Sequence, residues 1–223
     1  MIVRSILVHP NQQSLNGELF KMANARFAEL GYTVETLDLH ASKDAITESS
    51  EILYKTPRPD SERKYRSVYS NNYGNARQAG LLGDFSKNEL EMLQKADLVY
   101  VQTPIYVWSI PAILKLYIET VFIDDYVFTV TDAGGDKFHI EPHLKGKQVV
   151  FSFTTGGLPS MATQVLGSPE ALVQPVKPIF EFVGFEWLPH HVTWGTSKSL
   201  DKCDEYFNQF GEYLNNTFPL TGR

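Results

Sequence analysis

The sequence predicts a doubly wound α/β fold, in which a five-stranded parallel sheet carries helices on both faces. Short apolar runs alternate along the chain with segments whose apolar residues recur at helical spacing. One run, Leu98-Val99-Tyr100-Val101, is apolar throughout, which is typical of a strand buried on both faces of a parallel sheet. Three predicted strands also run into loops of small, hydroxyl or aromatic residues. Because open α/β sheets bind ligands beyond the carboxyl ends of their strands, these loops are candidates for one shared site.

The N-terminal part of the chain predicts a strand-helix-strand unit. Residues 2–8 form a buried strand, and Ser14 is a favourable N-cap for the helix that follows the next polar loop. The apolar stripe of that helix stops at Gly31, which is well placed as the glycine after a helix. Residues 33–39 form the second strand, which we expect to pair in parallel with the first through a right-handed crossover.

Residues 41–85 interrupt this alternation, since they show no sustained hydrophobic period. A loop of such length is usually functional, so we expect an excursion that covers the ligand site or a neighbouring subunit. The next helix is predicted to open on a Ser86-x-x-Glu89 capping box and to end near Lys95.

The stretch from Ala96 to Phe122 predicts a strand, an aromatic loop and a helix. Thr103-Pro104 ends the strand, because proline has no N–H for a ladder hydrogen bond. Pro111 is predicted at the first position of the helix. The loop carries two large aromatic side chains, Tyr106 and Trp108, which we interpret as the wall of a site for a planar ligand. The alternative is that both side chains only pack against a neighbouring loop.

The rest of the chain continues the pattern. We expect an irregular stretch with a short hairpin, a fourth strand that runs into a Thr-Thr-Gly-Gly loop, a helix, a fifth strand and a closing helix. In that order these segments span residues 123–143, 147–155, 168–183, 186–194 and 200–218. The glycines of the loop would let the backbone approach a ligand closely.

Composition narrows the classes of function. With 223 residues, of which 43% are hydrophobic, the chain can build one large core, and we expect a single domain over residues 1–223. A net charge of −6 argues against nucleic acid as the main partner, because binding it needs a basic face. The one cysteine, Cys203, fits a reducing cytoplasm, and we expect it to be a small buried hydrophobic residue. We expect neither a signal peptide nor a membrane span.

The loop after the first strand is a candidate anion site. It opens a helix, whose free N–H groups and dipole favour a negative charge, and Ser14 and Asn16 add hydroxyl and amide donors. Neither Gly-x-Gly-x-x-Gly nor Gly-x-x-x-x-Gly-Lys-Ser/Thr is present. A phosphate site made of hydroxyl and amide groups remains. The alternatives are that both residues only cap the helix and that His9 is a strand-end histidine satisfied by the backbone.

Several motifs occur in a consistent order along nearly the whole chain: His9-Pro10-x-x-x-Ser14-x-Asn16, Ala96-Asp97-Leu98, Pro104-x-x-x-Trp108-Ser109-Ile110-Pro111-Ala112-Ile113-Leu114-Lys115, Val121-Phe122, Thr154-Thr155-Gly156-Gly157, Gln174-Pro175 and Gly184-Phe185-x-x-Leu188. With these motifs the chain resembles the flavodoxin-like NAD(P)H:quinone oxidoreductase family. That family includes the vertebrate quinone reductases and the bacterial ancillary oxidoreductases of glutathione-gated potassium efflux systems. The resemblance implies a flavodoxin-like fold, a homodimer, and a bound flavin that is FAD, with FMN as the alternative.

The resemblance also implies roles for residues of this chain. The flavin phosphates are held by His9, Ser14, Leu15 and Asn16. The isoalloxazine ring is contacted on one side by Pro104, Ile105, Tyr106, Val107 and Trp108, and along its other edge by Thr154, Thr155, Gly156 and Gly157. Of these, Tyr106, Trp108 and Gly156 position the ring, and no side chain is catalytic, because the flavin carries the chemistry. Glu119 reaches the adenosine of FAD, and Phe128 closes the site of a partner subunit. No metal is expected.

The implied activity is a two-electron transfer. NAD(P)H would reduce the flavin and leave, and a quinone or similar small acceptor would take its place, giving ping-pong kinetics. In the vertebrate enzymes a Tyr and a His after the Thr-Thr-Gly-Gly loop assist proton transfer; the corresponding residues here are Ala162 and Ser168. Proton delivery is therefore expected from water or another group. Two other classes stay open: a flavin-binding regulatory subunit of a potassium-efflux transporter, and a small one-electron carrier.

Overall fold

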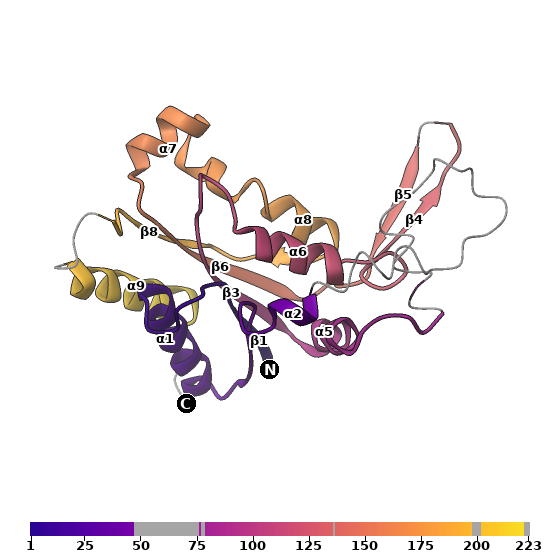
Figure 1. Cartoon of the computed structure of the whole chain (residues 1–223), viewed down its shortest axis with the longest axis horizontal. Coiled ribbons are helices and arrows are strands. Elements are labelled where there is room, and N and C mark those ends of the chain that lie inside the picture. The colour runs from indigo at the N-terminus through magenta and orange to yellow at the C-terminus, as the bar shows by residue number, and fades with distance from the viewer. Residues whose placement is uncertain (47–75, 77–78, 136, 198–201, 221–223) are drawn as a thin grey trace.

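The computed structural model describes residues 1–46, 76, 79–135, 137–197 and 202–220. Its centre is a parallel sheet with the strand order β2-β1-β3-β6-β7, in which β8 also pairs with β6. Helices cover both faces of this sheet (Figure 1). The predicted doubly wound fold is therefore confirmed, with the fifth strand split in two. The strands are β1 (Ile2–Leu7), β2 (Thr33–Asp38), β3 (Leu98–Pro104), β6 (Gln148–Thr155), β7 (Glu186–Trp187) and β8 (His191–Trp194).

Each face of the sheet has its own apolar core. On one face α1 (Leu15–Glu29) and α9 (Cys203–Thr217) pack around Phe27, Tyr100 and Phe210. On the other, α5 (Asp84–Lys95), α6 (Ala112–Val121) and α8 (Lys177–Phe182) pack around a second cluster that includes Tyr117 and Phe151. Every residue of β3 is buried, as its continuous apolar run predicted.

The first helix matches its prediction at both ends. Ser14 is the N-cap of α1, and its side chain accepts a hydrogen bond from the backbone N–H of Gly17. Gly31 follows the helix with a φ of +78°, a left-handed conformation that glycine adopts without steric cost.

Two predicted helix starts are wrong. Helix α5 begins at Asp84 with Gly83 as its N-cap, so Ser86 and Glu89 lie inside the helix and form no capping box. Glu89 instead forms a buried ion pair with Arg4 of β1. Pro111 is the N-cap of α6 and not its first helical residue. The observed start therefore lies three residues before the predicted one in α5 and one residue after it in α6.

The C-terminal half departs further from the predicted elements. Helix α7 (Pro159–Leu166) occupies a stretch predicted as loop. The helix predicted over 168–183 is a 3₁₀ turn, η1 (Pro169–Val173), followed by the short α8. Pro175 and Pro178 have no backbone N–H to donate, which prevents one continuous α-helix there. The strand predicted over 186–194 is interrupted at Leu188-Pro189-His190, and Pro189 lacks a ladder donor for the same reason.

An antiparallel hairpin of β4 (Phe128–Asp132) and β5 (Phe138–Pro142) confirms the short hairpin expected within 123–143. It stands out from the body of the molecule (Figure 1). Val130 pairs with Ile140, and both side chains are exposed, as is Phe138. An isolated two-stranded hairpin has little stability of its own in water, so this exposed apolar face is noteworthy.

Three further observations concern expectations from the sequence. Of the excursion predicted over 41–85, the structure describes the short helix α2 (Lys43–Ile46), Ala76 and residues 79–85; the remainder lies outside the described residues. Cys203 opens α9 and is partly exposed, so the prediction that it is buried is wrong. In the part of the chain that the structure describes, no helix is long and apolar enough to cross a bilayer.

Candidate functional site

Three loops lie side by side at one edge of the sheet, because β1, β3 and β6 are adjacent and parallel. They follow Leu7, Pro104 and Thr155, the last residues of those strands. The sheet ladder continues into the second loop, since the Ile105 N–H donates to the carbonyl of Thr154 at 2.8 Å. The expectation that these three loops share one rim is therefore confirmed by the topology.

A buried hydrogen-bond network joins two of these strands, β3 and β6, to the start of α1 beneath the rim. The Asn16 amide nitrogen donates to Thr154 Oγ1 at 2.8 Å, and the Gln102 amide nitrogen donates to Asn16 Oδ1 at 2.9 Å. The Tyr100 hydroxyl donates to Gln102 Oε1 at 2.6 Å. All four residues are buried, and burial raises the pKa of Tyr100 well above its usual value, so its hydroxyl remains a donor. The Asn16 side chain therefore ties the start of α1 to β3 and β6.

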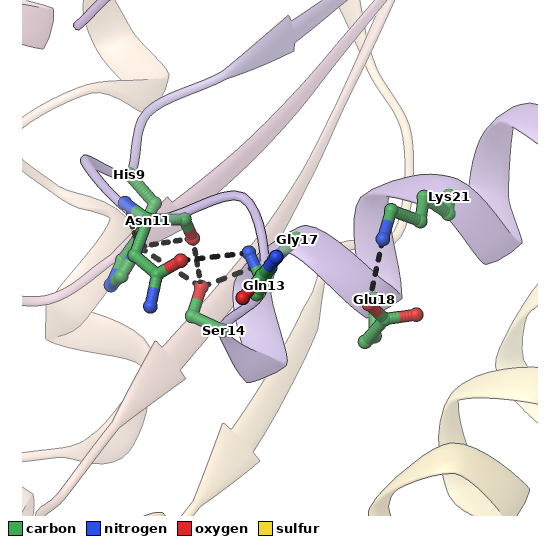
Figure 2. A network of polar contacts seen from close by, with 7 residues as sticks. All are labelled: His9, Asn11, Gln13, Ser14, Gly17, Glu18 and Lys21. Carbon is green, nitrogen blue, oxygen red and sulfur yellow. Dashed lines mark hydrogen bonds and ion pairs between the residues drawn. The ribbon is translucent and has the colours of Figure 1, made fainter.

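The loop after β1 is held by its own side chains (Figure 2). The Ser14 hydroxyl donates to the Asn11 carbonyl at 2.6 Å and lies 2.9 Å from His9 Nδ1, which also accepts from the Asn11 N–H at 3.1 Å. A Cβ on Gly17 would lie 1.9 Å from the Gln12 carbonyl oxygen, so only glycine fits where the loop meets the helix. Both the capping role of Ser14 and the backbone contact of His9 are thus present.

The same loop presents donors to an anion. The first-turn N–H groups of α1, such as those of Leu15 and Asn16, have no acceptor within the helix, and the helix dipole adds a partial positive charge. Asn11 and Ser14 fix the backbone of this turn through their side chains. A phosphate at this position would complete the helix N-terminus.

The loop after β3 is a two-residue turn. The backbones of Tyr106 and Ser109 exchange two hydrogen bonds of 2.9 and 3.0 Å, and Val107 and Trp108 between them have φ angles of +49° and +63°. The N–H groups of Val107 and Trp108 take no part in the bonds that close the turn. They are available to a ligand at the rim.

The loop after β6 approaches this turn closely. A Cβ on Gly157 would lie 2.8 Å from the Trp108 indole, so the ring packs directly on the glycine backbone. The loop is fixed from behind by residues after β8: the Gly195 N–H donates to the Gly157 carbonyl at 2.8 Å, and the Ser197 hydroxyl donates to that of Gly156 at 3.0 Å. Packing of Trp108 on a neighbouring loop, one of the two alternatives, is thus observed, whereas Tyr106 is 46% exposed and remains free to contact a ligand.

Sequence reasoning missed Tyr100, Gln102 and the segment 195–197. Tyr100 and Gln102 are part of a strand, and nothing in their spacing distinguishes a polar link from ordinary core residues. Residues 195–197 follow the last strand of the sheet, so their contact with the Gly156-Gly157 loop depends entirely on tertiary structure.

Two residues with expected roles are not brought to the rim within one chain. Glu119 lies on α6, on the opposite face of the sheet from α1, where it pairs with Lys115. Phe128 is 7% exposed and packs against Phe182, with ring centroids 4.8 Å apart. Its own core therefore holds the Phe128 ring, and a role of this residue at a partner's site stays a prediction.

The two positions that correspond to the expected proton-transfer residues of the vertebrate-type enzymes lie in and after α7. Ala162 is fully buried within α7, and Ser168 is the partly exposed residue before η1. Neither position offers a group that titrates near neutral pH.

Cavities flank the rim on both sides. One of about 330 Å³ lies between α1 and the strands β1 and β2. Another of about 420 Å³ adjoins the Gly157 loop at the start of α9. Near the first cavity, burial lowers the pKa of His40, and the backbone N–H of this residue donates to Asp38 Oδ1 at 2.9 Å. The first cavity therefore borders the loop after β1, and the second borders the loop after β6.

The fold and this rim define a doubly wound α/β protein with three ligand-type loops at one edge of its sheet. The chain belongs to the flavodoxin-like fold family, whose model matches residues 1–216. It is 28% identical over 200 residues to the mouse ribosyldihydronicotinamide dehydrogenase [quinone], covering 88% of this chain and 83% of that protein.

The chain is also similar to a bacterial ancillary protein and to a solved bacterial structure. The chain is 36% identical over 104 residues to KefF of Enterobacter sp. (strain 638), which is named as the ancillary protein of a glutathione-regulated potassium-efflux system. This match covers 45% of this chain and 53% of KefF. A crystal structure of a quinone reductase described as putative, from Klebsiella pneumoniae, superposes with a TM-score of 0.81 at 24% identity, covering 98% of this chain and 85% of that one. At that identity the superposition establishes the fold alone.

Proposed function

We propose that the protein is a flavin-dependent NAD(P)H oxidoreductase that transfers two electrons to a quinone or a similar small acceptor in a ping-pong cycle. The observation that carries the proposal is the convergence of three ligand-type loops on one rim, joined beneath it by the Asn16 network. The names of the relatives agree with this class of enzyme.

The residues present fit a flavin. The start of α1 suits a phosphate, with Ser14 and the N–H groups of Leu15 and Asn16 as donors and His9 beside them. The Trp108 indole packs directly on the backbone of Gly157, where a side chain would not fit, and the two together form a flat wall. When bound, a flavin would supply the two-electron chemistry, by which NAD(P)H and one proton reduce a quinone to a hydroquinone. The N–H groups of Val107 and Trp108 would face negative charge that develops on the ring, as in an oxyanion hole.

Neither of the two positions that carry Tyr and His in the vertebrate-type enzymes supplies a proton here, which leaves water or another group. Ala162 carries no acid, and the Ser168 hydroxyl does not ionise near neutral pH. We therefore propose that the acceptor is protonated from solvent, and that the rate of acceptor reduction lacks the steep pH dependence that a histidine donor would give.

We propose FAD as the cofactor, with FMN as the alternative, and a cytoplasmic single-domain homodimer as the working form. The exposed apolar face of the hairpin, formed by Val130, Phe138 and Ile140, supports a subunit contact. In that dimer Glu119 would reach the adenosine only from the partner subunit, because its own helix lies on the other face of the sheet from α1.

The first experiment is to identify the cofactor. Protein purified under native conditions is expected to be yellow, and mass spectrometry of the released compound distinguishes FAD from FMN. Mixing the holoenzyme with NADH or NADPH in a stopped-flow instrument should bleach the flavin absorbance, and a quinone should restore it. Colourless protein that takes up neither flavin would refute the proposal.

A second experiment separates the two roles of Ser14. Glycine caps a helix nearly as well as serine but has no hydroxyl, so Ser14→Gly keeps the cap and removes the donor. Loss of one hydrogen bond to a phosphate should weaken flavin binding about tenfold or more, with little change in stability. An unchanged dissociation constant would mean that Ser14 only caps the helix.

The alternative function is a flavin-binding regulatory subunit of a potassium-efflux transporter. The match to KefF favours it, although that match covers less than half of this chain. Stable co-purification with such a transporter, together with a negligible rate of NAD(P)H oxidation, would favour this alternative over the enzyme.

A further inference from the structure

The turn after β3 has a strained backbone, and at Val107 almost no side-chain contact within the described chain offsets that strain. Its two central residues, Val107 and Trp108, both have positive φ angles, which in a two-residue loop are those of a type I′ turn. Such turns favour Asn-Gly. A β-branched residue in this conformation is a backbone outlier, because its side chain crowds the neighbouring carbonyl.

The two strained residues differ in what offsets their strain. The Trp108 indole packs on Gly157 and against the main apolar core. Val107 is 96% exposed, so contacts with the rest of the described chain cover almost none of its side chain. Asparagine or glycine would form the same turn with less strain. Backbone strain without local compensation is found at sites where function maintains it.

We propose that Val107 is a specificity-determining residue, whose side chain makes an apolar contact with the acceptor that the enzyme reduces. This inference rests on the flavin-dependent function proposed above. Val107 and the half-exposed Tyr106 form the tip of the turn, next to the wall made by Trp108 and Gly157. No charged residue occurs between Leu98 and Leu114. The tip therefore suits a neutral planar acceptor, and this segment has no cationic side chain for an anionic one.

The test compares substitutions at position 107 that separate strain from contact. Val107→Asn and Val107→Gly relieve the backbone strain and remove the aliphatic surface. Val107→Thr keeps the shape and the β-branch, and it replaces one methyl group with a hydroxyl. The control is Leu220→Asn, which removes an exposed aliphatic side chain beyond α9. Each holoenzyme is assayed with a neutral alkyl-substituted benzoquinone, and Tm is measured on the flavin-free protein.

We expect Val107→Asn and Val107→Gly to raise Tm and to raise the KM for the quinone about fivefold, which corresponds to partial loss of one apolar side-chain contact. Val107→Thr should raise the KM with no gain in Tm, and Leu220→Asn should change neither quantity.

Two outcomes would overturn the inference while leaving the proposed function intact. One is an unchanged KM in all three Val107 variants, which would mean that the side chain only strains the turn. The other is an unchanged KM with a weakened dimer, which would make Val107 a subunit contact. If the wild-type protein neither binds flavin nor oxidises NAD(P)H, the proposed function fails first and this inference fails with it.

Discussion

Substitution of Asn16 tests whether one buried amide holds the rim together. Asn16 is 5% exposed and makes two side-chain hydrogen bonds, to Thr154 Oγ1 and from Gln102. Asn16→Ala leaves two partners buried without these bonds, since Gln102 and Thr154 are 0% and 4% exposed. Each such group costs about 1–3 kcal/mol, so we expect the two to cost about 2–6 kcal/mol, or about 10 °C in Tm.

Asn16→Asp provides the contrast, because it has nearly the same shape. The carboxylate can accept from Gln102 as the amide oxygen did, and the Thr154 hydroxyl can rotate to donate to it. Most of the hydrogen bonding is thereby retained. The new negative charge, however, lies at the helix start where a phosphate is proposed to bind, so flavin affinity should fall more than tenfold.

Chemical denaturation measures the stability of both variants, and fluorescence titration measures their affinity for flavin. Asn24→Ala is the matched control: it lies on the same helix and accepts a single hydrogen bond, from Ser5 at 2.5 Å. It should be destabilised less than Asn16→Ala and should bind flavin normally. If Asn16→Ala unfolds at the wild-type denaturant midpoint, or if Asn16→Asp binds flavin as tightly as wild type, the network does not have the role assigned to it.

Three further predictions concern other parts of the molecule. Gly157→Ala should displace the Trp108 indole, which would lie 2.8 Å from the new methyl group. We expect this variant to show altered tryptophan fluorescence and at least tenfold weaker flavin binding. Gly211→Ala, which places its methyl group in open space, should change neither the fluorescence nor the flavin affinity. Glu89→Gln removes one charge from a buried ion pair and should cost about 3–5 kcal/mol in the free energy of unfolding, measured by denaturant titration. Burial lowers the pKa of His191 to about 4, so between about pH 6.5 and 4 the unfolded state binds more protons than the folded state. The free energy of unfolding should therefore fall by up to about 3 kcal/mol as the pH drops through that range. His191→Phe should flatten this part of the curve of stability against pH. A pH profile of the variant that is as steep as that of the wild type would assign the acid sensitivity to other groups.

Local patterns predicted the sheet and the ends of its first helix well, because the local signal there was strong. The apolar run of β3, the N-cap Ser14 and Gly31 were all identified correctly, because burial on both faces, capping and left-handed backbone each depend on a few adjacent residues. The parallel order of the strands then placed three loops at one edge.

The errors arose where distant contacts outweigh local preference. The Ser86-x-x-Glu89 pattern is a good capping box by itself, but Glu89 pairs instead with Arg4, 85 residues away. Helix α7 follows a Gly-Gly-Leu-Pro stretch that is typical of a loop, and the predicted helix over 168–183 is divided at its prolines.

At the site, the sequence determined which residue types are available: a capped helix start, an aromatic turn and a glycine loop. Only the tertiary structure decided how they are joined, through Asn16 and Gln102 beneath the rim and Trp108 against Gly157 above it. Helix caps and strands are set by interactions between neighbours in the chain. Contacts between residues nearly 140 positions apart exist only once the sheet has brought three strand ends together.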